Sequence, residues 1–181
     1  MIILPEKRVI VVATPRTGSR ALNAAIIASG QKKSKVTREH HDWIEDVSRA
    51  ASGGEGGKFE IWTMIREPLS QLQSWLGHCQ HWHDVPGFIK QNRFRWFAPN
   101  GQMNYYHEIA TRLFIFENHG HQEMLDELGI DVPLLHIGGS QSKAKRDFTD
   151  HEKRLAYDKF RLDFDLYDHE VEEQSKRRAR Y

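Results

Sequence analysis

The chain has little of what marks a secreted, membrane-spanning or nucleic-acid-binding protein. One cysteine among 181 residues, Cys79, excludes an internal disulfide framework and suits a reducing compartment. The formal net charge is +1, whereas nucleic-acid-binding domains normally carry a strong basic excess. No apolar stretch approaches the roughly 20 residues that span a bilayer, and Pro5 with three charged residues interrupts the apolar start. We therefore expect a cytoplasmic protein with neither nucleic acid nor membrane as a partner.

What the chain does contain is the composition of a globular domain. Hydrophobic residues make up 39% and charged residues 28% of the sequence, which argues against disorder. The length is close to that of one ordinary domain, and no repeat or internal boundary is visible. We therefore expect a single domain over residues 1–181.

Apolar runs and helical periodicities alternate along the chain. Strands are predicted at 8–13, 35–37, 59–65, 112–117 and 132–137. Helices are predicted at 19–29, 43–51, after Pro68, at 121–128 and at 147–171. Thr149 and Glu152 are spaced as a capping box at the start of the last helix. This alternation predicts an α/β fold, specifically a P-loop-like three-layer fold with a central, mainly parallel sheet flanked by helices.

The junction between the first strand and its helix, "ATPRTGSRAL", is rich in groups that bind anions. Gly18 lets the backbone turn tightly, so that amides of the next helix point out of the strand end. Thr17 and Ser19 add hydroxyl donors, while Arg16 and Arg20 add positive charge. The Walker pattern G-x-x-x-x-G-K-[ST] is absent, which weakens the case for an ATP- or GTP-splitting loop. Taken alone, the junction also fits a plain capped turn with surface arginines.

A second feature follows the strand predicted at 59–65, in "IWTMIREPLSQLQSWL". Arg66 leaves the strand end, Pro68 marks a turn into a helix, and Ser74 comes eight residues after Arg66. An arginine at a strand end and a serine two turns into the following helix can face one pocket.

Together these residues resemble the sulfotransferase family that uses 3′-phosphoadenosine 5′-phosphosulfate. The family's 5′-phosphosulfate loop, [Pro]-[Lys/Arg]-[Ser/Thr]-Gly-[Thr/Ser], is similar to residues 15–19. Its 3′-phosphate motif, Arg-x-Pro with a serine eight residues after the arginine, is similar to Arg66, Pro68 and Ser74. Later stretches are similar more loosely, and the short chain suggests a small bacterial- or phage-like or carbohydrate-type member with reduced substrate-binding parts.

The resemblance implies roles for the matched residues. The 5′-phosphate and sulfate would be held by Pro15, Arg16, Thr17, Gly18, Ser19 and Arg20. The 3′-phosphate would be held by Arg66 and Ser74. Arg16 stands where many members have a lysine; it keeps its proton near neutral pH and would act electrostatically. A basic loop that closes over the nucleotide would contribute Lys143, Lys145 and Arg146, for which a solvated charge run is an equal alternative.

Transfer of a sulfuryl group to a hydroxyl requires in-line attack on sulfur and is helped by a base. The family takes this base from the segment after the second strand, here "KVTREHHDW". His41 or His40 is a candidate for this base, since an imidazole ordinarily titrates near pH 7. Glu39 would serve if burial raised its pKa, and "REHHDW" looks like the Lys-Glu-x-x-aromatic pattern of carbohydrate sulfotransferases. The candidate bases are therefore His41, Glu39 and His40.

Residues 78–106 are aromatic-rich and are expected to form an insertion or lid beside the acceptor, a small molecule or carbohydrate with a hydroxyl. His78, Cys79, His81 and His83 are not spaced as a zinc site, so no metal is expected.

The leading hypothesis is an enzyme that moves the sulfuryl group of 3′-phosphoadenosine 5′-phosphosulfate to a hydroxyl, leaving adenosine 3′,5′-bisphosphate. One alternative is a nucleotide or small-molecule kinase with a degenerate phosphate loop, which would require Mg²⁺ and ATP. The other is a non-catalytic module that retains the nucleotide pocket without an acceptor side.

Overall fold

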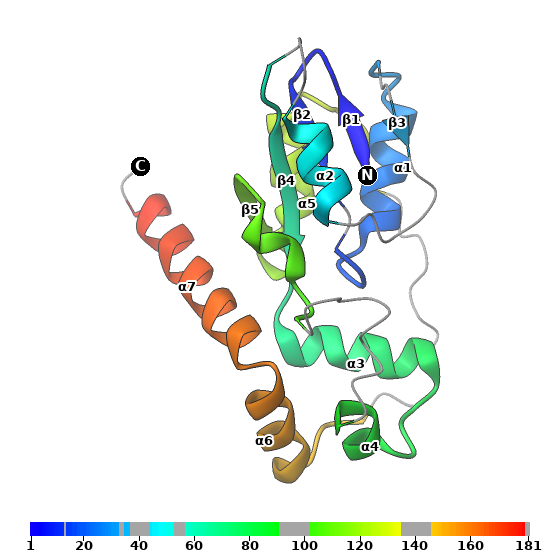
Figure 1. Cartoon of the computed structure of the whole chain (residues 1–181), viewed down its shortest axis with the longest axis vertical. Coiled ribbons are helices and arrows are strands. Elements are labelled where there is room, and N and C mark those ends of the chain that lie inside the picture. Colours follow the sequence, from blue (N-terminus) through cyan, green and yellow to red (C-terminus); the bar gives the residue numbers. More distant parts are fainter. Residues whose placement is uncertain are drawn as a thin grey trace. The chain divides into compact units, whose positions relative to one another are not determined.

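The computed structural model describes most of the chain, and its contacts gather in two compact units (Figure 1). The described residues are 1–12, 14–32, 35–36, 44–52, 57–90, 102–134 and 146–179. The first unit comprises Met1–Ile65 and Tyr106–Gly138, and the second comprises Arg66–Tyr105 and Gly139–Tyr181. Each unit is described below by itself.

The first unit is built on a five-stranded mixed sheet with the strand order β3-β1-β2-β4-β5. The strands are β1 Ile2–Leu4, β2 Val9–Val11, β3 Lys35–Val36, β4 Glu60–Ile65 and β5 Arg112–Ile115. Strands β2, β4 and β5 are parallel, while β1 pairs antiparallel with both β2 and β3. The predicted α/β class is confirmed, with a sheet that is parallel over its β2, β4 and β5 part.

Strand β1 was not predicted, because it has only three residues and is followed directly by Pro5. The chain reverses immediately, with the Lys7 amide donating to the Leu4 carbonyl over 3.2 Å. The last predicted strand, at 132–137, is not observed over residues 132–134, and residues 135–137 lie outside the described residues. The strand predicted at 112–117 ends at Ile115, and Phe116–Asn118 form a single 3-10 turn.

In its described residues, the first unit also contains the helices α1 Ser19–Ala28, α2 Ile44–Ala51 and α5 Gly120–Glu127. Helices α1 and α5 contact each other, and their apolar faces share one core with the sheet. This core includes Val9, Val11, Leu22, Ile26, Trp62, Met64, Phe114 and Leu125. Side chains alternate between the faces of a strand, so the buried Ile10, Ile61 and Ile65 lie on the opposite face. Burial on both faces explains the continuous apolar runs that made β2 and β4 predictable.

The described part of the second unit is helical, with α3 Pro68–Cys79, α4 Val85–Lys90, α6 Asp150–Lys159 and α7 Arg161–Arg178. Its core includes Leu72, Trp75, Leu76, Phe88, Met103, Phe148 and Phe160. Helix α3 begins at Pro68, and the preceding Glu67 carboxylate accepts the amides of Leu69 and Ser70 over 3.0 and 2.6 Å.

The helix predicted at 147–171 is two helices that meet at Phe160, whose buried ring joins the core of the second unit. The capping box of Thr149 and Glu152 is confirmed at the start of α6. Helix α4 was not predicted, since it has six residues and one turn of pattern is too short to recognise. Within the described residues, no helix combines the length and apolarity that a bilayer crossing requires.

Candidate functional site

The predicted anion-binding loop joins β2 to α1. Arg16 and Gly18 both adopt left-handed conformations, with φ angles of 65° and 71°. Gly18 is the N-cap of α1, and it provides no side-chain cap. The positive end of the α1 dipole therefore faces the loop. Gly18 supplies no carboxylate or hydroxyl to accept the first amides of the helix.

The residues of this loop differ in their exposure. Pro15, Thr17 and Ser19 are buried, Arg16 is partly buried, and Arg20 is exposed. The two arginines therefore give the loop its accessible positive charge.

Three buried threonines fasten the loop to β4. The Thr17 hydroxyl donates to the Thr14 carbonyl over 2.7 Å, and the Thr14 and Thr63 hydroxyl oxygens lie 2.9 Å apart. The Thr63 hydroxyl also lies 3.3 Å from the Val12 carbonyl, to which it donates. A hydroxyl carries one proton, so Thr63 accepts from Thr14. Because the Thr17 proton is donated inside the loop, the Thr17 hydroxyl does not serve as the outward-facing donor that the sequence predicted.

His121 of α5 lies against the glycine of the loop. A Cβ atom added to Gly18 would lie 2.7 Å from both Cε1 and Nε2 of His121, and 3.1 Å from the Phe116 ring. The His121 and Phe116 rings meet edge to face, with centroids 5.1 Å apart. Sequence reasoning missed His121, since only the packing of α5 beside α1 brings it to the loop. Glycine is therefore favoured at position 18, because of its left-handed backbone angle and because a side chain there would meet the His121 ring.

Arg66 and Ser74, the predicted 3′-phosphate residues, belong to the second unit. Arg66 directly follows β4, and Asn104 contacts both its backbone amide and its carbonyl, each over 3.4 Å. Ser74 lies on α3 and is partly buried. The residues predicted to hold the nucleotide are therefore divided between the first unit and the second.

Arg146, predicted to approach the nucleotide, has a carboxylate partner within the second unit. Its two terminal nitrogens donate to both oxygens of Glu152 over 2.7 and 2.5 Å, and its guanidinium lies 5.7 Å from the Trp82 ring centroid. Glu152 is 5% exposed, and the hydrogen bonds from Arg146 are the main reason why its pKa is lowered to about 2. Arg146 thus fastens the start of α6.

Replacing Glu152 with glutamine should lower the free energy of unfolding at neutral pH by about 1–2 kcal/mol. The expected loss is kept this small because the Arg146 side chain is 44% exposed and solvent screens the ion pair. The Glu152 pKa falls from 4.5 in the unfolded chain to about 2. Its contribution is therefore complete above pH 4.5 and is lost as the pH falls toward 2.

Urea denaturation at neutral pH and near pH 2 measures this difference. The gap between wild type and Glu152→Gln should shrink at the lower pH. Asp150→Asn is the control, since Asp150 lies in the same helical turn with its side chain 88% exposed. An equal gap at both pH values would contradict the assignment.

The remaining predicted residues are His41, Glu39, His40, Lys143 and Lys145, which lie outside the described residues. Their roles stay predictions, as does the lid over residues 78–106. In the parts of the chain that the structure describes, no three His, Cys, Asp or Glu side chains gather as metal ligands would.

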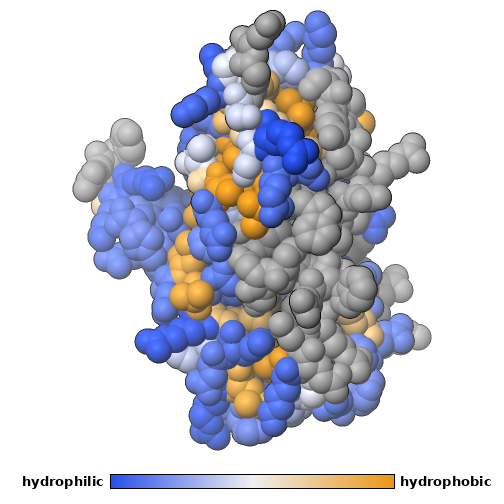
Figure 2. All heavy atoms as spheres, viewed as in Figure 1, coloured by the Kyte–Doolittle hydropathy of each residue, from blue (hydrophilic) through white to orange (hydrophobic). Residues whose placement is uncertain are grey.

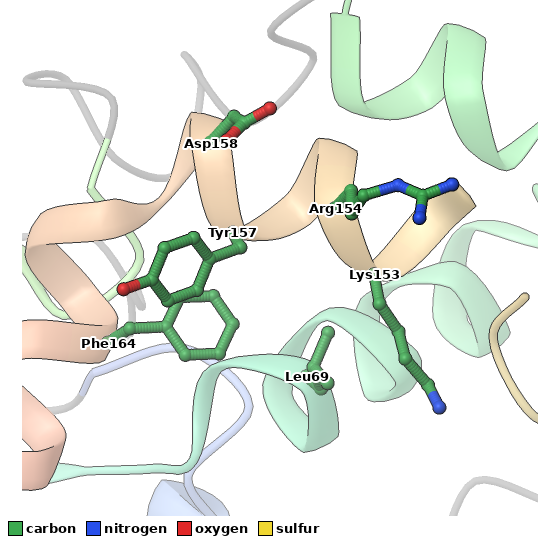
Figure 3. Close-up of a pocket in the computed structure, with 6 residues that line it drawn as sticks. All are labelled: Leu69, Lys153, Arg154, Tyr157, Asp158 and Phe164. Atoms are coloured by element: carbon green, nitrogen blue, oxygen red, sulfur yellow. The ribbon is translucent and has the colours of Figure 1, made fainter. Parts of the chain in front are cut away.

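A shallow, mostly apolar groove of about 260 Å³ lies on the second unit (Figure 3). Its lining residues are Leu69, Lys153, Arg154, Tyr157, Asp158 and Phe164. The Tyr157 and Phe164 rings lie side by side with centroids 5.2 Å apart (Figure 3). On the face seen in Figure 2, hydrophobic residues form small areas among hydrophilic ones. Sequence reasoning assigned this groove no role.

Comparisons with protein-family models, curated proteins and solved structures found no match for this chain.

Proposed function

We propose that the chain is a sulfotransferase that moves the sulfuryl group of 3′-phosphoadenosine 5′-phosphosulfate to a hydroxyl of a small molecule or carbohydrate. The observation that carries this proposal is the β2–α1 junction, where left-handed Gly18 opens a helix that it does not cap with a side chain. Such a junction favours a phosphate or sulfate group at the helix N-terminus. The proposal includes a P-loop-like layering of helices on the sheet.

The strand order supports a second contact from Arg66. Strands β2 and β4 are parallel neighbours, with Val11 opposite Trp62. Their carboxyl ends therefore lie at one edge of the sheet, the edge where ligands bind in parallel α/β folds. Arg66 follows the last residue of β4, and consecutive Cα atoms are about 3.8 Å apart, so its backbone starts at that edge.

In the proposed reaction, Arg16 and the α1 amides stabilise negative charge on the sulfate and the 5′-phosphate. His41, Glu39 or His40 takes the proton of the acceptor hydroxyl. The acceptor oxygen forms a bond to sulfur while the bond between sulfur and the bridging phosphate oxygen breaks. The products are the sulfated acceptor and adenosine 3′,5′-bisphosphate, and the step needs no metal.

Titration calorimetry with adenosine 3′,5′-bisphosphate, adenosine 5′-monophosphate and ATP tests the proposal, each with and without Mg²⁺. We expect the bisphosphate to bind most tightly and independently of Mg²⁺. Metal-dependent preference for ATP would overturn the proposal in favour of a kinase. Tight bisphosphate binding without turnover of the phosphosulfate on a broad panel of hydroxyl compounds would show a binding module instead.

A further inference from the structure

We propose that Asp163 and Asn104 are positioning residues that fix Arg66 and thereby determine selectivity for a 3′-phosphate. The inference rests on the proposed function, which assigns the 3′-phosphate to Arg66. It concerns two side chains that carry no recognisable motif and that the fold brings together within the second unit.

Asp163 holds the turn at residues 102–104. Asp163 belongs to the first turn of α7, and the residue is 1% exposed. One carboxylate oxygen accepts the Met103 amide over 3.0 Å, and the other accepts the Asn104 amide over 2.7 Å. A buried carboxylate requires such donors, and charge-assisted bonds of this kind are among the stronger ones in proteins. The turn is therefore firmly attached to α7.

Asn104 passes this constraint to Arg66. The residue is 1% exposed. Its side-chain oxygen Oδ1 accepts the Arg66 amide, and its side-chain nitrogen Nδ2 donates to the Arg66 carbonyl. Gln71 of α3 adds a contact from its side-chain nitrogen to the Met103 carbonyl over 3.4 Å. The Asn104 side chain thus contacts both backbone polar groups of Arg66, and the turn that carries Asn104 is bound to Asp163.

Fixing the backbone matters because an arginine side chain has several rotatable bonds. A guanidinium on a mobile backbone must lose more conformational freedom when it binds a phosphate than one on a fixed backbone. Asp163 and Asn104 therefore contribute to 3′-phosphate affinity without touching the nucleotide, and they should contribute little to the affinity for a 5′-phosphate.

The test is the ratio of two dissociation constants, for adenosine 5′-monophosphate and adenosine 3′,5′-bisphosphate, measured by calorimetry on the full chain. Asp163→Asn replaces an acceptor oxygen with a donor nitrogen opposite a backbone amide. We expect the ratio to fall about tenfold, through weaker bisphosphate binding, as for the loss of one hydrogen bond to a charged group. Asp165→Asn is the matched control, since its side chain is 58% exposed on the same helix, and it should leave the ratio unchanged.

Asn104→Ala is the second variant, which leaves both backbone amides available to Asp163 and removes the side-chain contacts to Arg66. It should lower the ratio of the two dissociation constants as well. If Asp163→Asn does not fold, the ratio measured for Asn104→Ala tests the inference. A purely structural role would lower the melting temperature of both variants without changing the ratio, and that result would overturn the inference. A wild-type chain without preference for the bisphosphate would instead overturn the proposed function.

Discussion

Replacing Gly18 with alanine should lower the free energy of unfolding by about 3 kcal/mol. One part of this cost is conformational, because an L-residue at a φ of 71° is strained. The other part is crowding, because the new methyl group would lie 2.7 Å from two atoms of the His121 ring. Relief of either strain would move the loop, so we also expect bisphosphate binding to weaken strongly.

Gly30→Ala separates the two parts. Gly30 has the same φ of 71°, but a Cβ atom there would meet no atom within 4 Å. Denaturation of this control should show the conformational cost alone, about 1–2 kcal/mol. The double variant Gly18→Ala with His121→Ala should be more stable than the sum of the single changes predicts, by about 1 kcal/mol. Strict additivity, or an equal loss at Gly18 and Gly30, would show that His121 does not crowd the loop.

Replacing Arg66 with alanine should weaken adenosine 3′,5′-bisphosphate binding by about 2 kcal/mol or more, roughly thirtyfold in the dissociation constant. The loss corresponds to removal of charge-assisted hydrogen bonds to one phosphate group. Binding of adenosine 5′-monophosphate should change little, because that nucleotide lacks the 3′-phosphate. Calorimetry with both nucleotides measures the two effects.

Two further variants sharpen the Arg66 experiment. Arg66→Lys should retain part of the affinity, since it keeps the charge and loses the paired donors of the guanidinium. Arg161→Ala is the control for a general loss of positive charge, because Arg161 is an exposed arginine of the same unit with its side chain 72% exposed. An unchanged bisphosphate affinity in Arg66→Ala would remove Arg66 from the site.

The parts of the fold that the sequence predicts are those where local pattern and burial agree. Strand β4 is a run of apolar residues because both faces of the sheet are buried there. The break at Phe160 was missed, because the residues on both sides are good helix formers and tertiary packing of the ring decides the bend. Strand β1 was missed because Pro5 directly follows its short apolar run, whereas the apolar run of β2 continues beyond the strand itself.

The same division applies to the site. Loop 15–20 is predictable, since its glycine, hydroxyls and arginines are consecutive in the sequence. His121, Asn104 and Asp163 are not, because each acts through a contact with a residue far away along the chain. The sequence also does not predict the partner of Arg146, because a basic residue before a helix is equally typical of a solvated charge and of a ligand-binding one. The structure pairs it with Glu152.

The inward orientation of Thr17 has a consequence for a loop proposed to hold an activated sulfuryl group. An enzyme that stores such a group beside its own hydroxyls risks sulfating itself. Thr17 is 1% exposed, and its hydroxyl points to the Thr14 carbonyl. With its oxygen turned into the protein, Thr17 would be shielded from sulfation in the proposed reaction, which would leave the sulfuryl group to the acceptor.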